Sequence, residues 1–201
     1  MSETRQRPGD DPHAEATLVA SLLPEGGRVL DAGCGEGRVA LRLHELGHPV
    51  VGVDADLSRL RVAAEANPRI PFWLSDLADL DIPQGIIGGG FDVIVMAGDV
   101  VPHLAPGTLP QVLQHLAGCL SPAGTLVAGF GLDPQHLAAD VAPVSLADYD
   151  AACAAAGLQL ADRYATWAGD AWAGGGYAVS LHRRAPARRD PLSRLRTLLH
   201  R

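Results

Sequence analysis

The sequence has no lysine, few aromatic residues and no long apolar run. All 16 basic residues are arginine, and aromatic residues make up 4% of the chain. The three cysteines, Cys34, Cys119 and Cys153, are widely separated and show no CxxC or Cys/His ligand spacing, so neither a disulfide framework nor a metal site is predicted. No stretch approaches 18 uninterrupted apolar residues, and no apolar segment follows the N-terminal charges. We therefore expect a cytoplasmic protein with no membrane partner.

Charge is distributed unevenly along the chain. The formal net charge is −7, but seven arginines lie in residues 183–201, where Asp190 is the only acid. Residues 1–182 therefore combine 9 arginines with 22 acids. Such an acidic body repels phosphate backbones, so a nucleic-acid partner is not expected unless the tail supplies the affinity. We expect residues 1–11 to be disordered and residues 185–201 to form an Arg-rich tail with a short amphipathic helix.

Residues 12–184 show alternating strand and helix patterns and are predicted to form one domain. A chain of 201 residues with 47% hydrophobic content is long enough to bury one core. The predicted strands are apolar throughout rather than alternating, which is typical of a parallel sheet covered on both faces. The expected strands are 28–33, 49–54, 71–76, 91–98 and 124–131, and the expected helices are 12–23, 36–46, 57–66, 108–120 and 145–156.

The last third of the chain breaks this rhythm. Two strand-like runs, 158–167 and 176–184, are joined by a segment too short for a parallel crossover, so they must be antiparallel. Residues 83–90 are predicted to be a flexible turn. The expected fold is a doubly wound α/β domain: a mostly parallel, seven-stranded sheet with an antiparallel last strand and helices on both faces.

The segment "DAGCGEG", residues 31–37, follows the first predicted strand and precedes a helix. Glycines here permit positive φ and leave the backbone open to a ligand. A dinucleotide fingerprint requires a small residue at the last position of G-x-G-x-x-G, where this chain has Arg38. Asp31 and Glu36 also make the turn unsuitable for a pyrophosphate. An acidic turn favours a cofactor that carries positive charge.

At these residues the sequence resembles the class I S-adenosylmethionine-dependent methyltransferases. "VLDAGCGEGRVA" is similar to that family's D/E-x-G-x-G-x-G motif, and further motifs follow in order over residues 28–184. The resemblance implies that Asp54 binds the ribose hydroxyls, and that Asp76 and the Leu77 backbone bind adenine. A simpler alternative for Asp54 is that it only caps the next helix. The implied S-adenosylmethionine-binding set is Asp31, Gly33, Cys34, Gly35, Gly37, Asp54, Ala55, Asp76, Leu77 and Ala97.

The methyl acceptor is expected beyond the ends of the fourth to sixth strands. Asp99 and His103 follow the fourth strand, and His103 is the candidate general base. The alternative is that His103 only binds the loop backbone. Phe130, Trp172 and Tyr177 are expected to line the acceptor side. Methyl transfer itself mainly requires that the acceptor be aligned with the methyl carbon.

The sequence therefore predicts a methyltransferase that acts on a small molecule by direct displacement, as a monomer or homodimer. The family's N/D-P-P-Y motif is absent, which disfavours methylation of adenine or glutamine amides. Three alternatives stay open: a module that binds S-adenosylmethionine without turnover, an NAD-dependent oxidoreductase, and an RNA methyltransferase that uses the basic tail.

Overall fold

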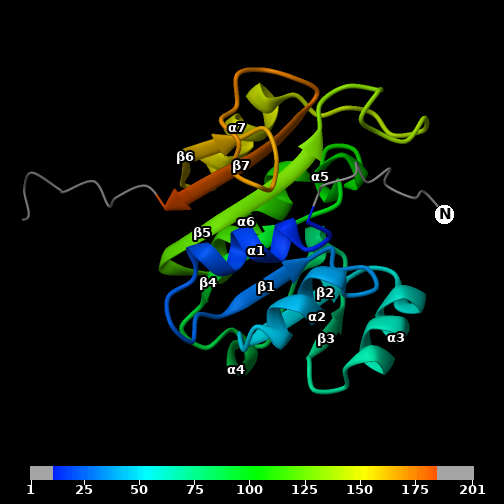
Figure 1. Ribbon diagram of the computed structural model, residues 1–201, viewed down its shortest axis with the longest axis vertical. Helices are drawn as coiled ribbons and strands as arrows, with labels where there is room; N and C mark the ends of the chain where they lie inside the picture. The colour runs from blue at the N-terminus through cyan, green and yellow to red at the C-terminus, as the bar shows by residue number, and fades with distance from the viewer. Residues whose placement is uncertain (1–10, 185–201) are drawn as a thin grey trace, which may run out of the picture.

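The computed structural model describes residues 11–184, apart from the side chain of residue 84, and they fold around a single seven-stranded sheet (Figure 1). The strand order is β3-β2-β1-β4-β5-β7-β6. The expected disordered N-terminus and Arg-rich tail lie outside the described residues, except for Asp11. The strands are β1 Val29–Ala32, β2 Val50–Asp54, β3 Phe72–Leu74, β4 Phe91–Met96, β5 Leu120–Gly131, β6 Leu158–Tyr164 and β7 Tyr177–Arg184.

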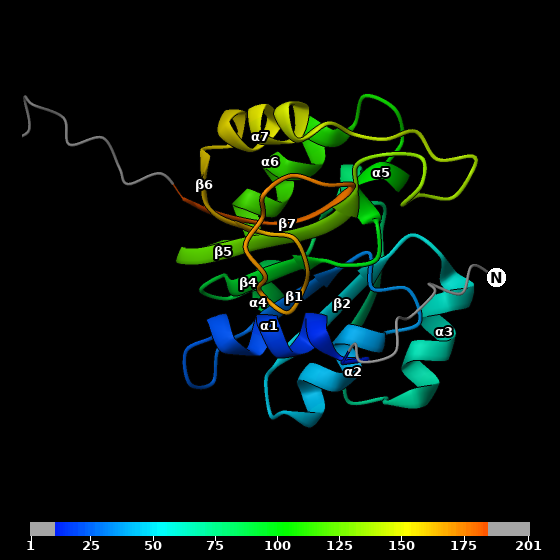
Figure 2. The ribbon, with the colours of Figure 1, turned by 45° about the horizontal axis from the view of Figure 1, so that its top comes forward.

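Helices cover both faces of this sheet (Figure 2). On one face lie α1 Ala14–Leu22, α2 Arg38–Glu45 and α3 Leu57–Ala66. On the other lie α6 Leu109–Cys119 and α7 Leu146–Ala155. Three shorter helical segments are the 3₁₀ turn η1 Leu77–Asp79, α4 Gln84–Ile87 and α5 Val100–His103. In the described part of the chain, no helix is long and apolar enough to cross a membrane.

The pairing of the strands confirms the predicted doubly wound fold with an antiparallel end. Neighbouring strands are parallel from β3 through β5, whereas β7 pairs antiparallel with both β5 and β6. Because five parallel strands run the same way, the turns that follow them meet along one edge of the sheet. Most of the sequence-predicted site residues lie along that edge.

The hydrophobic core consists of two layers separated by the sheet. One layer lies under α6 and α7 and includes Phe130 and Tyr149, whose rings meet edge to face. The other lies under α1 and α2 and includes Val19 and Leu43. Strands β1 and β4 are buried on both faces, which explains why they read as continuous apolar runs.

Residues 83–90 contain the short helix α4, so the expectation of a flexible turn there was wrong. The Arg28 guanidinium donates to the carbonyl oxygens of Ile86, Ile87 and Gly90, and it lies 5.0 Å from the centre of the Phe91 ring. These long-range contacts fix a segment whose own glycine-rich sequence favours a turn. Two boundaries also differ: β3 ends at Leu74, before the predicted "SD", and β5 begins earlier, at Leu120, with a register shift opposite Phe91.

Candidate cofactor and acceptor site

The glycine turn after β1 takes the backbone conformation that its sequence predicts. Gly33, Gly35 and Gly37 have φ values of 79°, 54° and 83°. A Cβ on Gly33 would lie 2.6 Å from a Val100 methyl carbon, so this position has no room for a side chain. The turn is fixed to β2 because the Gly33 and Cys34 amides both donate to the Val53 carbonyl oxygen, at 2.8 and 2.9 Å.

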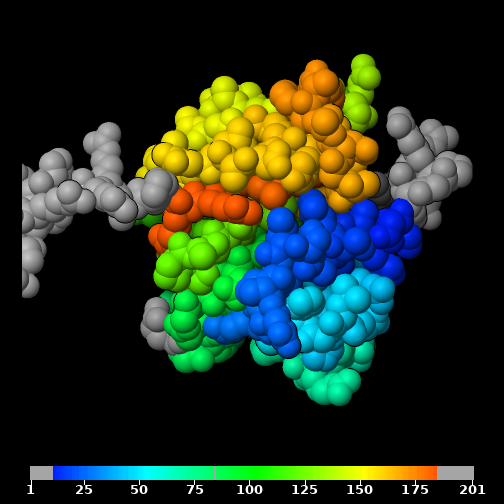
Figure 3. Space-filling model, turned by 60° about the vertical axis from the view of Figure 1, so that its left-hand side comes forward, coloured from blue at the N-terminus to red at the C-terminus, as the bar shows by residue number. Residues whose placement is uncertain are grey.

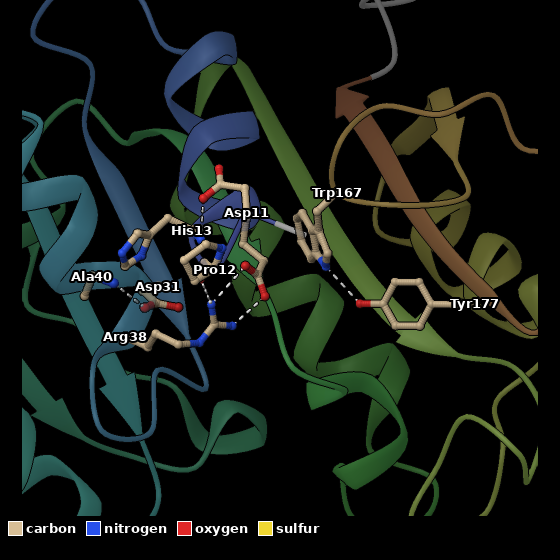
Figure 4. Close-up of polar contacts among 9 residues, drawn as sticks. Asp11, Pro12, His13, Asp31, Arg38, Ala40, Trp167 and Tyr177 are labelled. Carbon is tan, nitrogen blue, oxygen red and sulfur yellow. Dashed lines mark hydrogen bonds and ion pairs between the residues drawn. The ribbon is translucent and has the colours of Figure 1, made fainter. Parts of the chain in front are cut away.

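Asp31 lies under this turn and holds the start of α2. Its side chain is 2% exposed, and Oδ2 accepts a hydrogen bond of 3.0 Å from the Ala40 amide (Figure 4). The N-cap of α2 is Gly37, which has no side chain that could accept from the first-turn amides. Asp31, which lies in β1, accepts from one of them, the Ala40 amide. Burial raises the pKa of Asp31 to about 7, with the Ala40 hydrogen bond opposing that effect. A nearby positive charge would therefore stabilise the ionised form.

Asp54, at the end of β2, joins that strand to the glycine turn. Its Oδ2 accepts from the Gly35 amide at 2.7 Å and its Oδ1 from the Asp56 amide at 2.8 Å. The cap of α3 is Asp56, whose Oδ1 accepts from the Ser58 amide at 2.8 Å. Asp54 is therefore not the N-cap of the next helix. A carboxylate has about four acceptor positions, so these two bonds leave capacity for hydroxyl donors.

Asp76 and Leu77 follow β3 at the same edge. Asp76 is exposed, and its Oδ1 accepts from the Ala78 amide at 2.8 Å, which caps η1. Leu77 is buried.

The other three residues of the predicted cofactor set follow other strands of the sheet. Ala55 is exposed after β2, and Ala97 is half-buried after β4. Cys34 is buried in the glycine turn, and this burial raises the pKa of its thiol well above the usual range.

These residues fit S-adenosylmethionine by the chemistry of their donors and acceptors. Three consecutive strand ends each supply one aspartate, Asp31, Asp54 and Asp76, and all three belong to one edge of the sheet. Such carboxylates accept from hydroxyls and amines and attract a sulfonium or ammonium group, but they repel phosphate. The first of them is buried, where its negative charge is costly unless a cation is near.

Helix α1 borders both this turn and the segment before β7 (Figure 3). Arg38, the first residue of α2, donates to both Glu15 carboxylate oxygens, at 2.9 and 2.5 Å, and to the Pro12 carbonyl oxygen at 3.2 Å (Figure 4). Arg38 is thus engaged by α1 at the position where a dinucleotide fingerprint needs a small residue.

Asp99 is the one residue other than glycine with a positive φ in the described ranges, at 62°. Its Oδ1 accepts from the Gly131 amide at 2.8 Å, which ties the segment after β4 to the end of β5. His103 is exposed, and its Nδ1 lies 2.8 Å from the Asp99 carbonyl oxygen within the same turn of α5. This is the backbone contact that the simpler interpretation of His103 predicted.

Of the three residues expected on the acceptor side, Tyr177 is the first residue of β7 and lies on the α1 side of the sheet. Its hydroxyl accepts from Trp167 Nε1 at 2.9 Å, and both side chains are half-buried beyond α1 (Figure 4). A Cβ on Gly129 would lie 2.4 Å from the Trp167 ring and 2.8 Å from the Tyr177 hydroxyl oxygen, so the pair lies directly on bare β5 backbone. Burial raises the pKa of Tyr177 well above its usual range.

The other two residues do not join this pair. Phe130 is fully buried against Tyr149, so the expectation that its ring lines the rim was wrong: alternate residues of β5 face opposite sides, and its side faces α7. Trp172 lies 5.6 Å from the Arg163 guanidinium, which pairs with Asp150 of α7 at 2.6 Å. It therefore lies on the α7 side of the sheet, away from Tyr177.

A further pair at this edge, Asp133 and His136, was not predicted from the sequence. His136 Nδ1 lies 2.8 Å from Asp133 Oδ1, and both side chains are partly exposed. This hydrogen bond is the main cause that lowers the pKa of Asp133. The D-x-x-H spacing is the sequence signal that could have identified this pair.

Comparison with known proteins adds the decisive observation. A protein-family model described as a methyltransferase domain matches residues 29–124. A TehB-like S-adenosylmethionine-dependent methyltransferase from Corynebacterium glutamicum superposes with a TM-score of 0.78 and 28% identity, over 88% of this chain and 90% of that one. Residues 29–124 thus match the methyltransferase-domain family, and the fold of the described residues is similar to that of an S-adenosylmethionine-dependent methyltransferase.

Two curated relatives show how far this likeness extends. The putative methyltransferase YqeM of Bacillus subtilis is 30% identical over 66% of this chain and 53% of its own length. The magnesium-protoporphyrin O-methyltransferase of Rhodobacter capsulatus is 30% identical over 58% of this chain and 52% of its own. The chain thus spans about half the length of the curated relatives that it matches. The family model ends at residue 124, before Trp167, Tyr177 and the Asp133–His136 pair.

Proposed function

We propose that this protein transfers a methyl group from S-adenosylmethionine to a small-molecule acceptor that binds beyond the ends of β4, β5 and the start of β7. The observation that carries this proposal is the row of three aspartates, Asp31, Asp54 and Asp76, on consecutive strand ends around the glycine turn. Asp54 is assigned to the ribose hydroxyls, Asp76 to the adenine amine, and Asp31 to the electrostatic attraction of the positively charged donor.

The division of the sheet supports the location of the acceptor. The cofactor residues follow β3, β2 and β1, which form one half of the sheet. The next strands along the edge are β4 and β5, so an acceptor that approaches the donor meets Asp99, Tyr177 and Trp167. When bound, S-adenosylmethionine supplies an electrophilic methyl group; the protein aligns the acceptor with it and excludes water.

Isothermal titration calorimetry with S-adenosylmethionine and its demethylated product, S-adenosylhomocysteine, tests the proposal. We expect both to bind, and we expect Asp140→Asn, a change at an exposed acid of the β5–α7 loop, to leave both affinities unchanged. Absence of binding at millimolar cofactor would refute the proposal. Tight binding without methyl transfer across a broad panel of acceptors would instead support a binding module.

A further inference from the structure

Two glycines of β5 create a flat surface on the α1 side of the sheet. Gly129 and Gly131 are two residues apart in one strand, so their absent side chains would point to the same side. A Cβ on Gly129 would enter the Trp167–Tyr177 pair, and a Cβ on Gly131 would lie 3.0 Å from the His136 Cβ. The aromatic pair and His136 therefore adjoin the same stretch of bare backbone.

The end of β5, which leads into the Asp133–His136 pair, is fixed on two sides. The Gly131 amide donates to Asp99 Oδ1, and the Leu132 amide donates to the Gly176 carbonyl oxygen at 2.7 Å. A Cβ on Gly176 would lie 2.2 Å from His136 Nδ1 and 2.3 Å from Asp133 Oδ2, so a side chain at residue 176 would displace the pair. Glycine at this position is thus required for the pair to lie beside the first residue of β7, Tyr177.

The hydrogen bond between the two side chains defines their chemistry. A carboxylate that accepts from Nδ1–H holds the imidazole in the tautomer whose Nε2 is free to take a proton. The other titratable groups on the elements that meet here are Asp99, which binds the end of β5, and Tyr177 of β7. Both side chains are partly exposed, at 45% for His136 and 41% for Asp133.

We infer that His136 is the general base of the proposed methyl transfer, positioned by Asp133, and that the acceptor is a hydroxyl on a planar aromatic ring that lies on the Trp167–Tyr177 pair. This inference rests on the proposed function. A base is needed only where the acceptor must lose a proton, which a hydroxyl does. The Trp167 and Tyr177 rings are partly buried on a bare strand, and an aromatic surface there suits a planar acceptor.

The step balances without any further reactant. His136 Nε2 takes the hydroxyl proton, and the oxygen lone pair forms the bond to the methyl carbon. The electrons of the broken carbon–sulfur bond stay with sulfur, which becomes a neutral thioether. The proton on the imidazolium then passes to solvent. Asp133 stabilises the imidazolium and is a positioning residue, whereas His136 contacts the acceptor and is a catalytic one.

The test compares two acceptors that differ in acidity. Catechol is protonated at neutral pH and needs a base, whereas the more acidic hydroxyl of 4-nitrocatechol ionises near neutral pH and needs little help. General bases contribute about 10²–10⁴-fold to a rate. At neutral pH we expect His136→Gln to reduce kcat/KM about 100-fold for catechol but less than about 5-fold for 4-nitrocatechol. His44→Gln, in the last turn of α2, is the matched control and should affect neither rate.

Two readouts separate this role from a structural one. In Asp133→Asn, kcat/KM should fall for catechol but not for 4-nitrocatechol, because the imidazole loses the carboxylate that orients it. The visible absorbance of 4-nitrocatechol in the S-adenosylhomocysteine complex should show ionisation at lower pH in wild type than in His136→Gln. Equal losses for both acceptors in His136→Gln, or cofactor binding without turnover of either acceptor, would overturn the inference. Failure to bind cofactor would instead refute the proposed function.

Discussion

The two halves of the sheet hold their candidate functional groups in different ways. In the cofactor half, β1 to β3, the groups are backbone amides and short aspartates at strand ends, and each carboxylate is fixed by backbone amides. In the acceptor half, β4 to β7, the groups are three long side chains that adjoin bare β5 backbone: Trp167 and His136 from loops, and Tyr177 from the first position of β7. The first arrangement depends on local sequence, and the second depends on which face of the sheet a side chain reaches.

This difference matches what each half is proposed to bind. A shared cofactor requires the same acceptors at the same strand ends, and the family model matches residues 29–124, which contain them. The acceptor half lies largely beyond that range. The following changes test whether the halves act separately.

The largest effect is expected from Asp54→Ala in the cofactor half. The change removes the acceptor of the Gly35 and Asp56 amides and, by our proposal, two charge-assisted bonds to the ribose. Hydrogen bonds to a charged group contribute about 1.5–3 kcal/mol each, so S-adenosylmethionine affinity should fall about 10²–10⁴-fold. Calorimetry measures the loss, with Asp140→Asn as the control. Affinity within threefold of wild type would contradict the ribose assignment.

The next effect concerns the stability of the same half, through Asp31. Burial raises the pKa of this carboxyl from 3.8 to about 7, so the folded state binds its proton more tightly than the unfolded chain does. Its contribution to stability is thus fully present below about pH 4 and is lost as the pH rises to about 7, by roughly 4 kcal/mol at most.

Asp31→Asn keeps an acceptor for the Ala40 amide but cannot ionise. Relative to this variant, wild type should lose stability between pH 4.5 and 7.5, as measured by urea denaturation without cofactor. Asp140→Asn, at an exposed position, should follow the wild-type curve. Parallel curves for wild type and Asp31→Asn would show that Asp31 does not titrate in this range.

Much of the fold and of the cofactor half could be predicted from the sequence. Strand and helix order, the antiparallel β7 and the failure of the dinucleotide fingerprint at Arg38 follow from periodicity and spacing. These features depend on residues that are close together in the sequence, and the folded sheet does not change them. The prediction of a turn at residues 83–90 failed because contacts distant in sequence outweigh local propensity there. Arg28 donates to three carbonyl groups of residues 86–90 and so fixes a segment whose glycines favour a turn.

The acceptor half was predicted less well because strand position alone does not tell which face a residue occupies. Phe130 and Tyr177 lie on paired strands at the same edge of the sheet, yet the Phe130 ring is in the core under α7, whereas the Tyr177 ring faces α1. Trp172 lies in the same loop as Trp167, but Arg163 holds it on the opposite side. The role proposed for His136 depends on its contacts with Asp133 and Gly176, and residue 176 is 40 positions further along the chain.

A smaller effect is expected from Gly129→Ala in the acceptor half. The added methyl group would displace Trp167 and Tyr177, and overpacking of this kind costs about 1–3 kcal/mol. We expect a lower Tm and altered tryptophan fluorescence, with S-adenosylmethionine affinity within about twofold of wild type. A loss of cofactor affinity comparable to that of Asp54→Ala would mean that the halves are not separable.

The smallest effect is expected where α1 connects the halves. Arg38 is 52% exposed and Glu15 15%, so their ion pair is partly screened, and such pairs contribute about 0.2–1 kcal/mol. Glu15→Gln should lower the Tm by about 1–3 °C at low salt and by less at high salt, because added ions screen the wild-type pair. Helix α1 also packs its buried Val19 in the same apolar cluster as Trp167 and Tyr177, and this contact does not depend on charge. A destabilisation above about 2 kcal/mol would therefore show that the ion pair, rather than apolar packing, holds α1 across the two halves.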